Sequence, residues 1–196
     1  MSGKPWWYRL RVPLAVLAIT ASGFEAARFA GYRLNLSPSE PVGVWRVRAG
    51  AAAVGDYAYF CPPVALKRYP FLFKGGCPGG SMPFLKKLAA GPGALIRETA
   101  AGVWIDGKRL PASRPRIVSL GSDPVLLPHW RGAVRLQAGQ FWAYGSGDPA
   151  QSFDSRYWGP LSATRIEGVA WPVWTVSWPG ETAASRNNDD NTKESR

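Results

Sequence analysis

The sequence predicts one mainly β domain of antiparallel strands that follows an apolar N-terminal helix. Three observations predict this fold class. The 196 residues are enough for one domain with a sizeable core, together with a helix and a tail. Aromatic residues make up 13% of the chain, which also contains 22 glycines and 18 prolines, and this composition is typical of many short strands joined by turns. A charge-free apolar run lies near the N-terminus.

Residues 1–34 have the pattern of a membrane-directed segment. Lys4, Arg9 and Arg11 precede an uncharged apolar run, residues 12–24. Such a basic flank places the N-terminus in the cytoplasm and the rest of the chain outside it. The run is shorter than the ~20 residues that a spanning helix prefers. The segment is therefore a signal sequence that is later removed or a marginal anchor, and a buried helix of a soluble domain is the alternative.

The loop that follows holds two serines, Ser37 and Ser39, among two prolines and a glycine. Proline fixes φ and removes a backbone donor, so this stretch cannot be an ordinary helix. The cluster is either a linker between helix and domain or a stiff loop that presents a serine nucleophile at a fixed angle. On its own, the loop leaves both interpretations open.

The domain itself, residues 35–179, is a succession of short strand patterns. An Asp-Gly pair at 106–107 predicts a type I′ hairpin turn, and Pro172 breaks the last strand pattern. Residues 61–82 form an insertion, and residues 180–196 are predicted to be a disordered tail because they hold almost no apolar side chains. The expected strands are 44–47, 57–60, 83–90, 94–97, 102–105, 108–110, 116–120, 140–144 and 164–174.

Two cysteines, Cys61 and Cys77, lie in the insertion. Outside the cytoplasm an isolated pair predicts one disulfide, which stabilises the fold by roughly 3 kcal/mol in the chain-entropy model. Two unpaired thiols are the alternative. A metal site would need more ligands, because the chain has one histidine. We therefore expect neither a metal nor a cofactor.

The formal net charge of +11 is compatible with nucleic acid, anionic lipid or a solvated surface. The sequence contains no run of basic residues and no nucleic-acid motif, so we expect no specific nucleic-acid binding. The apolar N-terminal segment makes membrane lipid the expected partner.

A serine nucleophile needs a base, and the sequence offers one histidine and one lysine pair. His129 lies in a proline-flanked segment, where a lone surface histidine is the simpler interpretation. Lys86 and Lys87 lie within an apolar strand pattern, and because side chains alternate along a strand, one of them must face apolar surface. Burial lowers the pKa of an amine, so that lysine could take a serine proton. The alternative is an edge strand protected by a lysine pair.

A third polar cluster, Ser-Phe-Asp-Ser-Arg-Tyr-Trp-Gly, occupies residues 152–159. Asp154 and Arg156 are two residues apart and could pair across a turn, while Ser152 could orient a neighbouring group. Taken alone, this is an ordinary loop braced by an acidic and a basic residue.

Together and in this order, the three clusters resemble the type I signal peptidase family of Ser-Lys proteases. Ser39-Glu-Pro-Val-Gly43 resembles its nucleophile box, residues 84–93 its lysine box and residues 147–159 its third box, which is the most specific. The resemblance implies a LexA-like antiparallel β domain of coiled sheets without metal or cofactor. Two departures are Ala94, where the family has Asp, and Gly-Asp-Pro-Ala at 147–150, where it has Gly-Asp-Asn-Arg.

The resemblance also implies a role for each matching position. Ser39 is the implied nucleophile and Lys86 the implied general base. The hydroxyl of Ser37 is implied to form the oxyanion hole, beside the backbone N–H of Ser39. Three supporting positions are implied as well: Ser152, Asp154 and Arg156. The first of these three is the serine that orients the lysine, and the other two form a structural pair.

More narrowly, the chain resembles the conjugative-transfer (TraF-type) branch of this family, through its Asn35-x-Ser-Pro-Ser form, its small size and the cysteine pair before the lysine box. The branch is implied to process a conjugative pilin at the periplasmic face of the bacterial inner membrane, and it can join the pilin's ends. Two alternatives remain. One is a general leader peptidase that removes signal peptides, and the other is a non-catalytic, membrane-tethered β module that binds a partner.

Overall fold

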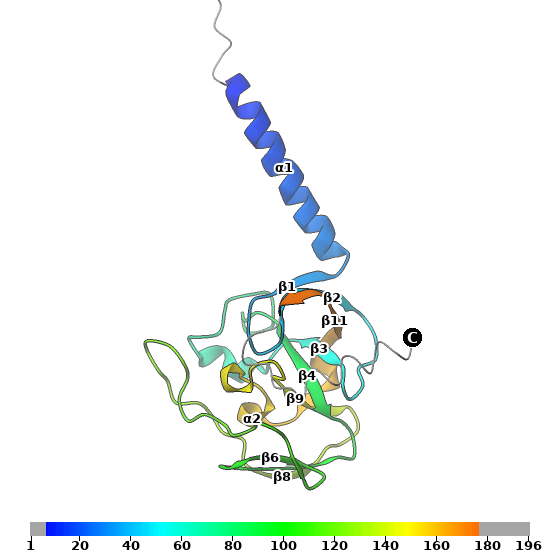
Figure 1. Ribbon diagram of the computed structural model, residues 1–196, viewed down its shortest axis with the longest axis vertical. Helices are drawn as coiled ribbons and strands as arrows, with labels where there is room; N and C mark the ends of the chain where they lie inside the picture. Colours follow the sequence, from blue (N-terminus) through cyan, green and yellow to red (C-terminus); the bar gives the residue numbers. More distant parts are fainter. Residues whose placement is uncertain (1–6, 177–196) are drawn as a thin grey trace, which may run out of the picture.

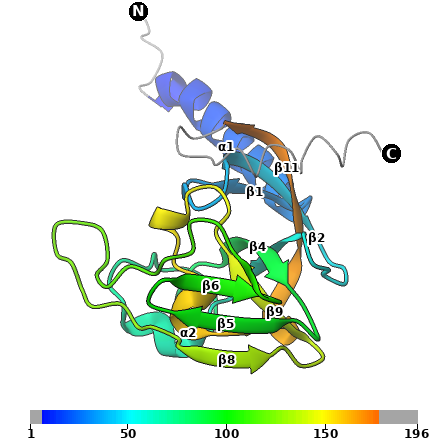
Figure 2. The same cartoon turned by 60° about the horizontal axis from the view of Figure 1, so that its bottom comes forward.

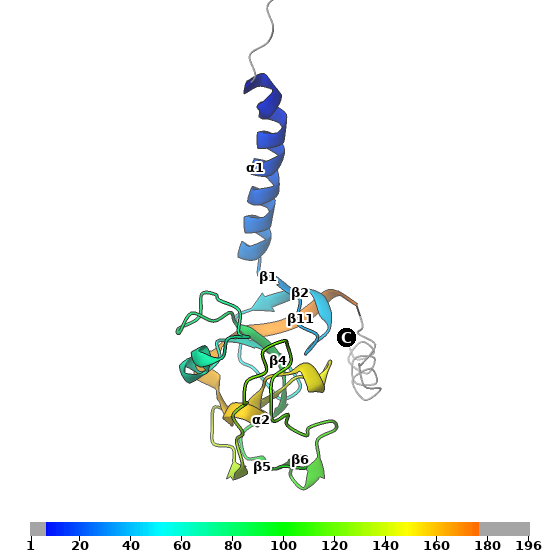
Figure 3. The same cartoon turned by 90° about the vertical axis from the view of Figure 1, so that its left-hand side faces the viewer.

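A computed structural model describes residues 7–176 of the chain, so the predicted cytoplasmic flank before residue 7 and the predicted disordered tail, 180–196, lie outside the described residues. Helix α1, Trp7–Phe29, projects away from a β domain and joins it beside β1 (Figures 1 and 3). The described part therefore consists of one isolated helix and one domain.

The projecting helix is longer than the charge-free run of the sequence. It continues through Glu25 and Arg28, whose side chains pair at 3.4 Å. Leu10–Phe29 spans 20 residues with a mean hydropathy of 1.4, and none of it is buried by the domain. At about 1.5 Å per residue this length matches a bilayer core. The helix has the character of a membrane anchor or a signal sequence, and the alternative of a buried helix in a soluble domain is wrong.

The domain is built from two antiparallel sheets. The seven-stranded sheet has the order β1-β2-β11-β3-β4-β9-β10, and the four-stranded sheet has the order β7-β6-β5-β8. Figure 2 shows β5, β6 and β8 side by side. The first sheet comprises β1 (Tyr32–Asn35), β2 (Val42–Arg48), β3 (Tyr57–Phe60), β4 (Phe84–Ala90), β9 (Gln140–Tyr144), β10 (Leu161–Ser162) and β11 (Ile166–Val176). The second comprises β5 (Leu95–Thr99), β6 (Gly102–Ile105), β7 (Lys108–Arg109) and β8 (Gly132–Arg135). The predicted mainly antiparallel β fold with an N-terminal apolar helix is confirmed.

Most expected strands are present, but the one expected at 116–120 is wrong. This segment makes only an isolated bridge between Val118 and Leu126. Prolines on both sides of it supply no backbone donors, so a continuous ladder cannot form there. β1, β8 and β10 were not expected, because each is short and carries few apolar residues. β1 spans the expected domain boundary between residues 34 and 35.

The last strand, β11, continues beyond Pro172, and the break expected there is a local shift of register. β11 pairs with β3 over Ile166–Ala170 and with β2 over Val169–Val176, and its register shifts between Pro172 and Trp174. At Pro172 only one neighbour is present, so the missing N–H can face the unpaired side.

The core extends along the central strands of the large sheet. It includes two clusters of apolar side chains. Phe60 and Leu88 belong to the cluster on the large sheet, and Ile96, Val103 and Trp142 belong to the cluster where the two sheets meet; all five are completely buried. β4 lies between β3 and β9 and is hydrogen-bonded on both sides. The lysine pair on β4 is therefore held in an interior strand, and the edge-strand alternative is wrong.

The insertion is closed by the disulfide between Cys61 and Cys77, with a Cα–Cα distance of 5.5 Å. Tyr69 and Phe71 of the insertion pack on Phe153, with ring centroids 5.5 and 5.2 Å away, respectively. The predicted disulfide is thus present in the structure, and the insertion packs against the third polar cluster.

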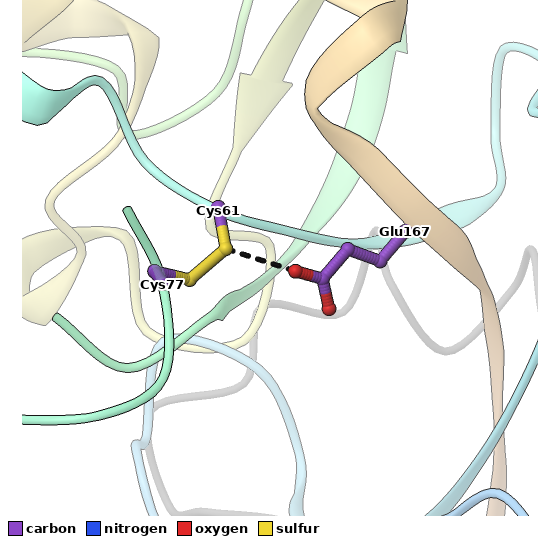
Figure 4. A group of neighbouring side chains, drawn as sticks. All are labelled: Cys61, Cys77 and Glu167. Atoms are coloured by element: carbon purple, nitrogen blue, oxygen red, sulfur yellow. Dashed lines mark hydrogen bonds between the residues drawn. A yellow bond between two sulfur atoms is a disulfide. The ribbon is translucent and has the colours of Figure 1, made fainter. Parts of the chain in front are cut away.

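Glu167 on β11 lies beside this disulfide, with Oε1 2.9 Å from the sulfur of Cys61 (Figure 4). These three side chains are close enough to one another to hold a metal ion. However, disulfide sulfurs offer no thiolate, which is the form that binds metals. In this oxidation state the group is a packing contact and not a metal site.

Glu98 on β5 is a buried acidic residue whose carboxyl group lacks hydrogen-bond partners within residues 7–176. The residue is 3% exposed, and neither of its carboxylate oxygens has a hydrogen-bond partner in the described part of the chain. Burial raises the pKa of Glu98 to about 9, with Asp154 acting in the same direction and Arg156 and Arg131 acting against it. At neutral pH the side chain is therefore protonated in the folded protein.

We expect Glu98→Gln to flatten the pH dependence of folding stability. Between the ordinary carboxyl pKa and the raised value, the folded chain keeps a proton that the unfolded chain releases, so stability falls as pH rises. The slope contributed by one such group is at most about 1.4 kcal/mol per pH unit. Urea unfolding of the full chain at about pH 6 and about pH 8 measures this slope. The exposed control Asp123→Asn should keep the parental slope, and an equally steep slope in E98Q would contradict the expectation.

Candidate active site

The two candidate serines lie in the loop between β1 and β2, which Asn35 braces. Its side-chain nitrogen donates to the carbonyl oxygens of Ser37, Glu40 and Pro41 at 2.9, 3.0 and 3.0 Å. Its side-chain oxygen accepts from the Ser37 N–H at 3.1 Å. Asparagine is suited to this task because it can satisfy backbone groups in a turn that has no regular ladder. The loop buries Ser39, which is 2% exposed, and leaves Ser37 exposed.

The structure brings Ser39 and Lys86 together. The Lys86 Nζ on β4 lies 2.6 Å from the Ser39 Oγ and donates to the Leu85 carbonyl at 3.1 Å. Lys86 is 5% exposed, and its amine also lies over the ring of Phe84, 5.6 Å from the centroid. Lys87 points to the other side of the sheet, where its Nζ lies 5.3 Å from the centroid of Tyr57. The alternation of the strand thus selects Lys86 as the buried amine.

The environment of Lys86 favours the neutral amine. Burial lowers the pKa of Lys86, because the ammonium loses its water. The carboxylates of Glu40 and Asp154 act in the opposite direction, and Arg156 acts with burial. An amine with a lowered pKa is more often unprotonated near neutral pH and can then accept a proton.

Ser37 places a second hydroxyl beside the first. The Ser37 Oγ is 2.9 Å from the Ser39 Oγ and 3.4 Å from the Ser39 backbone nitrogen. The Ser37 hydroxyl and the Ser39 backbone N–H therefore lie close to the Ser39 hydroxyl. If Ser39 attacked a carbonyl group, the carbonyl oxygen would become negatively charged near these two donors. Donors in this position stabilise an oxyanion.

The third cluster forms a buried ion pair at the start of α2, Ser155–Trp158. Asp154 caps this short helix, and its carboxylate accepts from the Arg156 Nε at 2.7 Å and Nη2 at 2.8 Å. The same carboxylate accepts from the Gly145 N–H at 2.9 Å. Asp154 and Arg156 are both completely buried. The pair therefore joins α2 to the end of β9.

Ser152 contacts this ion pair and not the lysine. Its hydroxyl donates to Asp154 at 2.7 Å, and residues 7–176 contain no hydrogen bond between Ser152 and Lys86. The lysine-orienting contact that the resemblance implies is therefore not formed. Ser152 can act on Lys86 only through Asp154, whose charge raises the pKa of that amine.

His129 is not part of the site. Neither of its ring nitrogens has a hydrogen-bond partner among the described residues, so it contacts neither serine. It lines a cavity of about 300 Å³ together with Arg114, Arg116 and Arg131. The serine–histidine alternative is therefore wrong.

At both places where the sequence departs from the family pattern, residues 147–150 and Ala94, the backbone makes hydrogen bonds that hold the local turn. At 147–150, the N–H groups of Gly147 and Asp148 donate to the carbonyls of Ser39 and Pro38 at 3.0 and 2.9 Å, respectively. At the other departure, the Ala94 N–H donates to a carbonyl three residues earlier at 3.2 Å. The different sequence at 147–150 therefore does not prevent this segment, which follows β9, from binding the serine loop.

Glu40 is the neighbour of the dyad that the sequence reasoning did not identify. It is completely buried, and its carboxylate accepts from the Lys87 N–H at 2.9 Å, the Ser146 N–H at 3.1 Å and the Ser146 hydroxyl at 2.7 Å. Burial raises the pKa of Glu40 to about 7, against the opposing effects of Lys86 and these hydrogen bonds. The sequence signal that could have identified Glu40 is its position as an acidic residue directly after the candidate nucleophile.

An antiparallel β domain that holds a buried lysine amine against a serine hydroxyl, with further donors beside it, has the architecture of the serine–lysine peptidase class. In this class an amine takes the place of the histidine of other serine hydrolases. Comparison with known proteins leads to a peptidase family as well. The sequence model described as signal peptidase, peptidase S26, matches residues 6–175, and the chain belongs to this family.

Relatives that match most of the chain are named as transfer proteins. The conjugal transfer protein TraF of Agrobacterium tumefaciens (strain 15955) is 38% identical over 167 residues, which cover 82% of this chain and 89% of the relative. The probable conjugal transfer protein TraF of Sinorhizobium fredii is 36% identical over 183 residues, or 89% and 92% of the two chains. The plasmid transfer protein TraF of Escherichia coli is 29% identical over 170 residues, or 84% and 91%. The resemblance to the signal peptidase family and to its TraF-type branch is confirmed.

A solved structure of a signal peptidase I from Enterococcus faecalis V583 is also similar. It is 18% identical, and the alignment covers 62% of this chain and 98% of that chain with a TM-score of 0.37.

Proposed function

We propose that this chain is a membrane-associated serine endopeptidase that matures an exported precursor, a conjugative pilin, by acyl transfer. The observation that carries the proposal is the 2.6 Å contact between the Lys86 amine and the Ser39 hydroxyl at a buried position. The relatives named as conjugal or plasmid transfer proteins support the link to conjugation.

In the acylation step, neutral Lys86 accepts the proton of the Ser39 hydroxyl as the Ser39 oxygen attacks a peptide carbonyl. The carbonyl oxygen becomes an oxyanion that accepts hydrogen bonds from the Ser37 hydroxyl and the Ser39 N–H. One such donor is typically worth about 3 kcal/mol in the transition state. The C–N bond then breaks, the leaving amine takes the proton back from Lys86, and an acyl ester on Ser39 remains.

The ester can be released in two ways. A water molecule that gives a proton to Lys86 hydrolyses it to a linear product. The substrate's own amino end, reacting in the same position, closes a ring with a peptide bond. Both routes regenerate the Ser39 hydroxyl, so the same two side chains serve cleavage and cyclisation.

The rest of the chain supports a location of this chemistry at a membrane. Helix α1 has the length and hydropathy to span the bacterial inner membrane, and a disulfide is expected on its oxidising, periplasmic side. The net positive charge favours contact with anionic lipid. We therefore propose a periplasmic domain whose substrate reaches it from the same bilayer.

The full chain in detergent micelles, incubated with the pilin precursor of its own conjugative system, tests the substrate. We expect cleavage beside small residues and, by mass spectrometry, either a linear product or a cyclic product lighter by one water. Unrelated precursors with signal peptides should be cleaved much more slowly. Equal rates on all precursors would favour the general leader peptidase instead.

The non-catalytic alternative is tested by covalent chemistry. A serine-reactive acylating probe should label Ser39, as located by peptide mapping. Absence of labelling together with absence of cleavage would favour a membrane-tethered β module that only binds a partner.

A further inference from the structure

We propose that Glu40 is a positioning residue of the dyad: its buried carboxylate fixes the serine loop against the lysine strand, and the charge of that carboxylate controls the protonation of Lys86. The inference rests on the proposed peptidase function. It concerns a residue that follows the nucleophile in sequence and accepts a hydrogen bond from the backbone N–H of the residue after the base.

The first part of the proposal is mechanical. Glu40 belongs to the serine loop, yet its carboxylate accepts from the Lys87 N–H, directly beside the base on β4. It also accepts from both the N–H and the hydroxyl of Ser146. One side chain thus joins three segments at the site. Charge-assisted hydrogen bonds of this kind are roughly twice as strong as neutral ones.

The backbone packs the same segments closely. The carbonyl of Ser39 accepts from the Gly147 N–H at 3.0 Å. A Cβ added at Gly147 would lie 2.9 Å from both the Glu40 Cα and the Pro38 carbonyl oxygen. The serine loop therefore packs directly on the backbone of Gly147, next to the residue that supplies two of the Glu40 hydrogen bonds.

The second part of the proposal is electrostatic. Glu40 is completely buried, and the charged groups that act on the same amine are Asp154 and Arg156. Of these, Asp154 is paired with Arg156 at 2.7 Å, whereas the hydrogen-bond partners of the Glu40 carboxylate are uncharged donors. A charge on Glu40 is therefore less compensated than the charge on Asp154. Its opposing effect on the pKa of Lys86 is the largest of the carboxylate effects.

These two titrations are coupled. Burial raises the pKa of Glu40 to about 7 and lowers the pKa of Lys86. When Glu40 loses its proton, its charge favours the ammonium form of Lys86, which cannot act as a base. Removing the carboxylate charge should therefore let Lys86 become neutral at a lower pH. The two groups therefore titrate as a coupled pair.

Two substitutions separate the mechanical from the electrostatic part. Glu40→Gln keeps the length and an accepting oxygen but removes the charge, so we expect the acid limb of kcat/KM to move to lower pH by about 1 unit. Glu40→Asp keeps the charge but is one carbon too short to reach β4. For E40D we expect kcat/KM to fall about tenfold or more at every pH, because a misplaced nucleophile reacts slowly, with the acid limb near its parental pH.

The Lys86 amine itself provides a readout that needs no substrate. The ¹³Cε chemical shift of Lys86, assigned by its loss in Lys86→Arg, is followed against pH in the full chain and in E40Q. A lower midpoint in E40Q supports the proposal even if no precursor is cleaved, in which case only the proposed function fails. Equal midpoints in both proteins overturn the proposal even if peptidase activity is intact.

Discussion

Ser39→Ala and Lys86→Met are each expected to lower kcat/KM for precursor cleavage by about 10⁴-fold or more without unfolding the domain. Alanine removes the hydroxyl that forms the acyl ester. Methionine fills nearly the same space as lysine in the buried position beside Ser39 but has no amine to accept the proton. Each change removes one member of a buried pair, but the remaining group keeps a partner: the Lys86 amine still donates to the Leu85 carbonyl, and the Ser39 hydroxyl still contacts Ser37.

The matched control is Lys87→Met. Lys87 is the next residue on β4, but its amine lies over Tyr57 on the other side of the sheet. This variant keeps the backbone N–H that Glu40 accepts from, so cleavage should remain near the parental rate. Rates are measured with the full chain in micelles under single-turnover conditions, with circular dichroism to check folding.

The double variant gives a second criterion. Side chains that act as one unit in a reaction show strongly non-additive effects. The Ser39→Ala, Lys86→Met double variant should therefore be about as slow as either single variant. Parental activity in either single variant would show that the dyad is not the catalytic pair, and additive losses would show that the two side chains act independently.

The presence of a buried lysine could be predicted because the lysine pair lies in an apolar strand, where adjacent side chains face opposite sides. One of two adjacent lysines in an apolar strand must be buried, and the structure shows that Lys86 is that residue. The sequence could not decide between Lys86 and Lys87 from alternation alone, since both faces of β4 carry apolar neighbours. Only the resemblance to the lysine box indicated the right residue.

The surroundings of the dyad were less predictable for a physical reason. Glu40 and Asn35 act by hydrogen bonds to backbone groups of segments that are distant in sequence or irregular in conformation. Such contacts follow from loop geometry, which has no periodic sequence signal. α2 was expected to be part of a loop for a related reason. Its four residues are too few to show the periodicity of a helix in the sequence.

Asp154→Ala is expected to destabilise the domain by about 3–5 kcal/mol, which is the typical cost of breaking a buried ion pair from one side. Asp154 and Arg156 are 0% exposed, and the carboxylate accepts two hydrogen bonds from the guanidinium. Without Asp154 the guanidinium would stay buried without its counter-charge. The cap of α2 and the contacts to Ser152 and the Gly145 N–H would be lost as well. Urea unfolding at neutral pH measures the loss.

A double-mutant cycle separates the ion pair from these other contacts. Arg156→Met removes the charge that Asp154 compensates, and Asp154→Ala together with Arg156→Met removes both charges. If the unpaired guanidinium causes most of the loss, the double variant should be more stable than the sum of the single losses predicts. Strictly additive losses would instead assign the effect to the cap and the hydroxyl contacts. Because Asp154 raises the pKa of Lys86 and Arg156 lowers it, Asp154→Ala should move the acid limb of cleavage to lower pH and Arg156→Met should move it to higher pH, whereas a purely structural role would leave it in place.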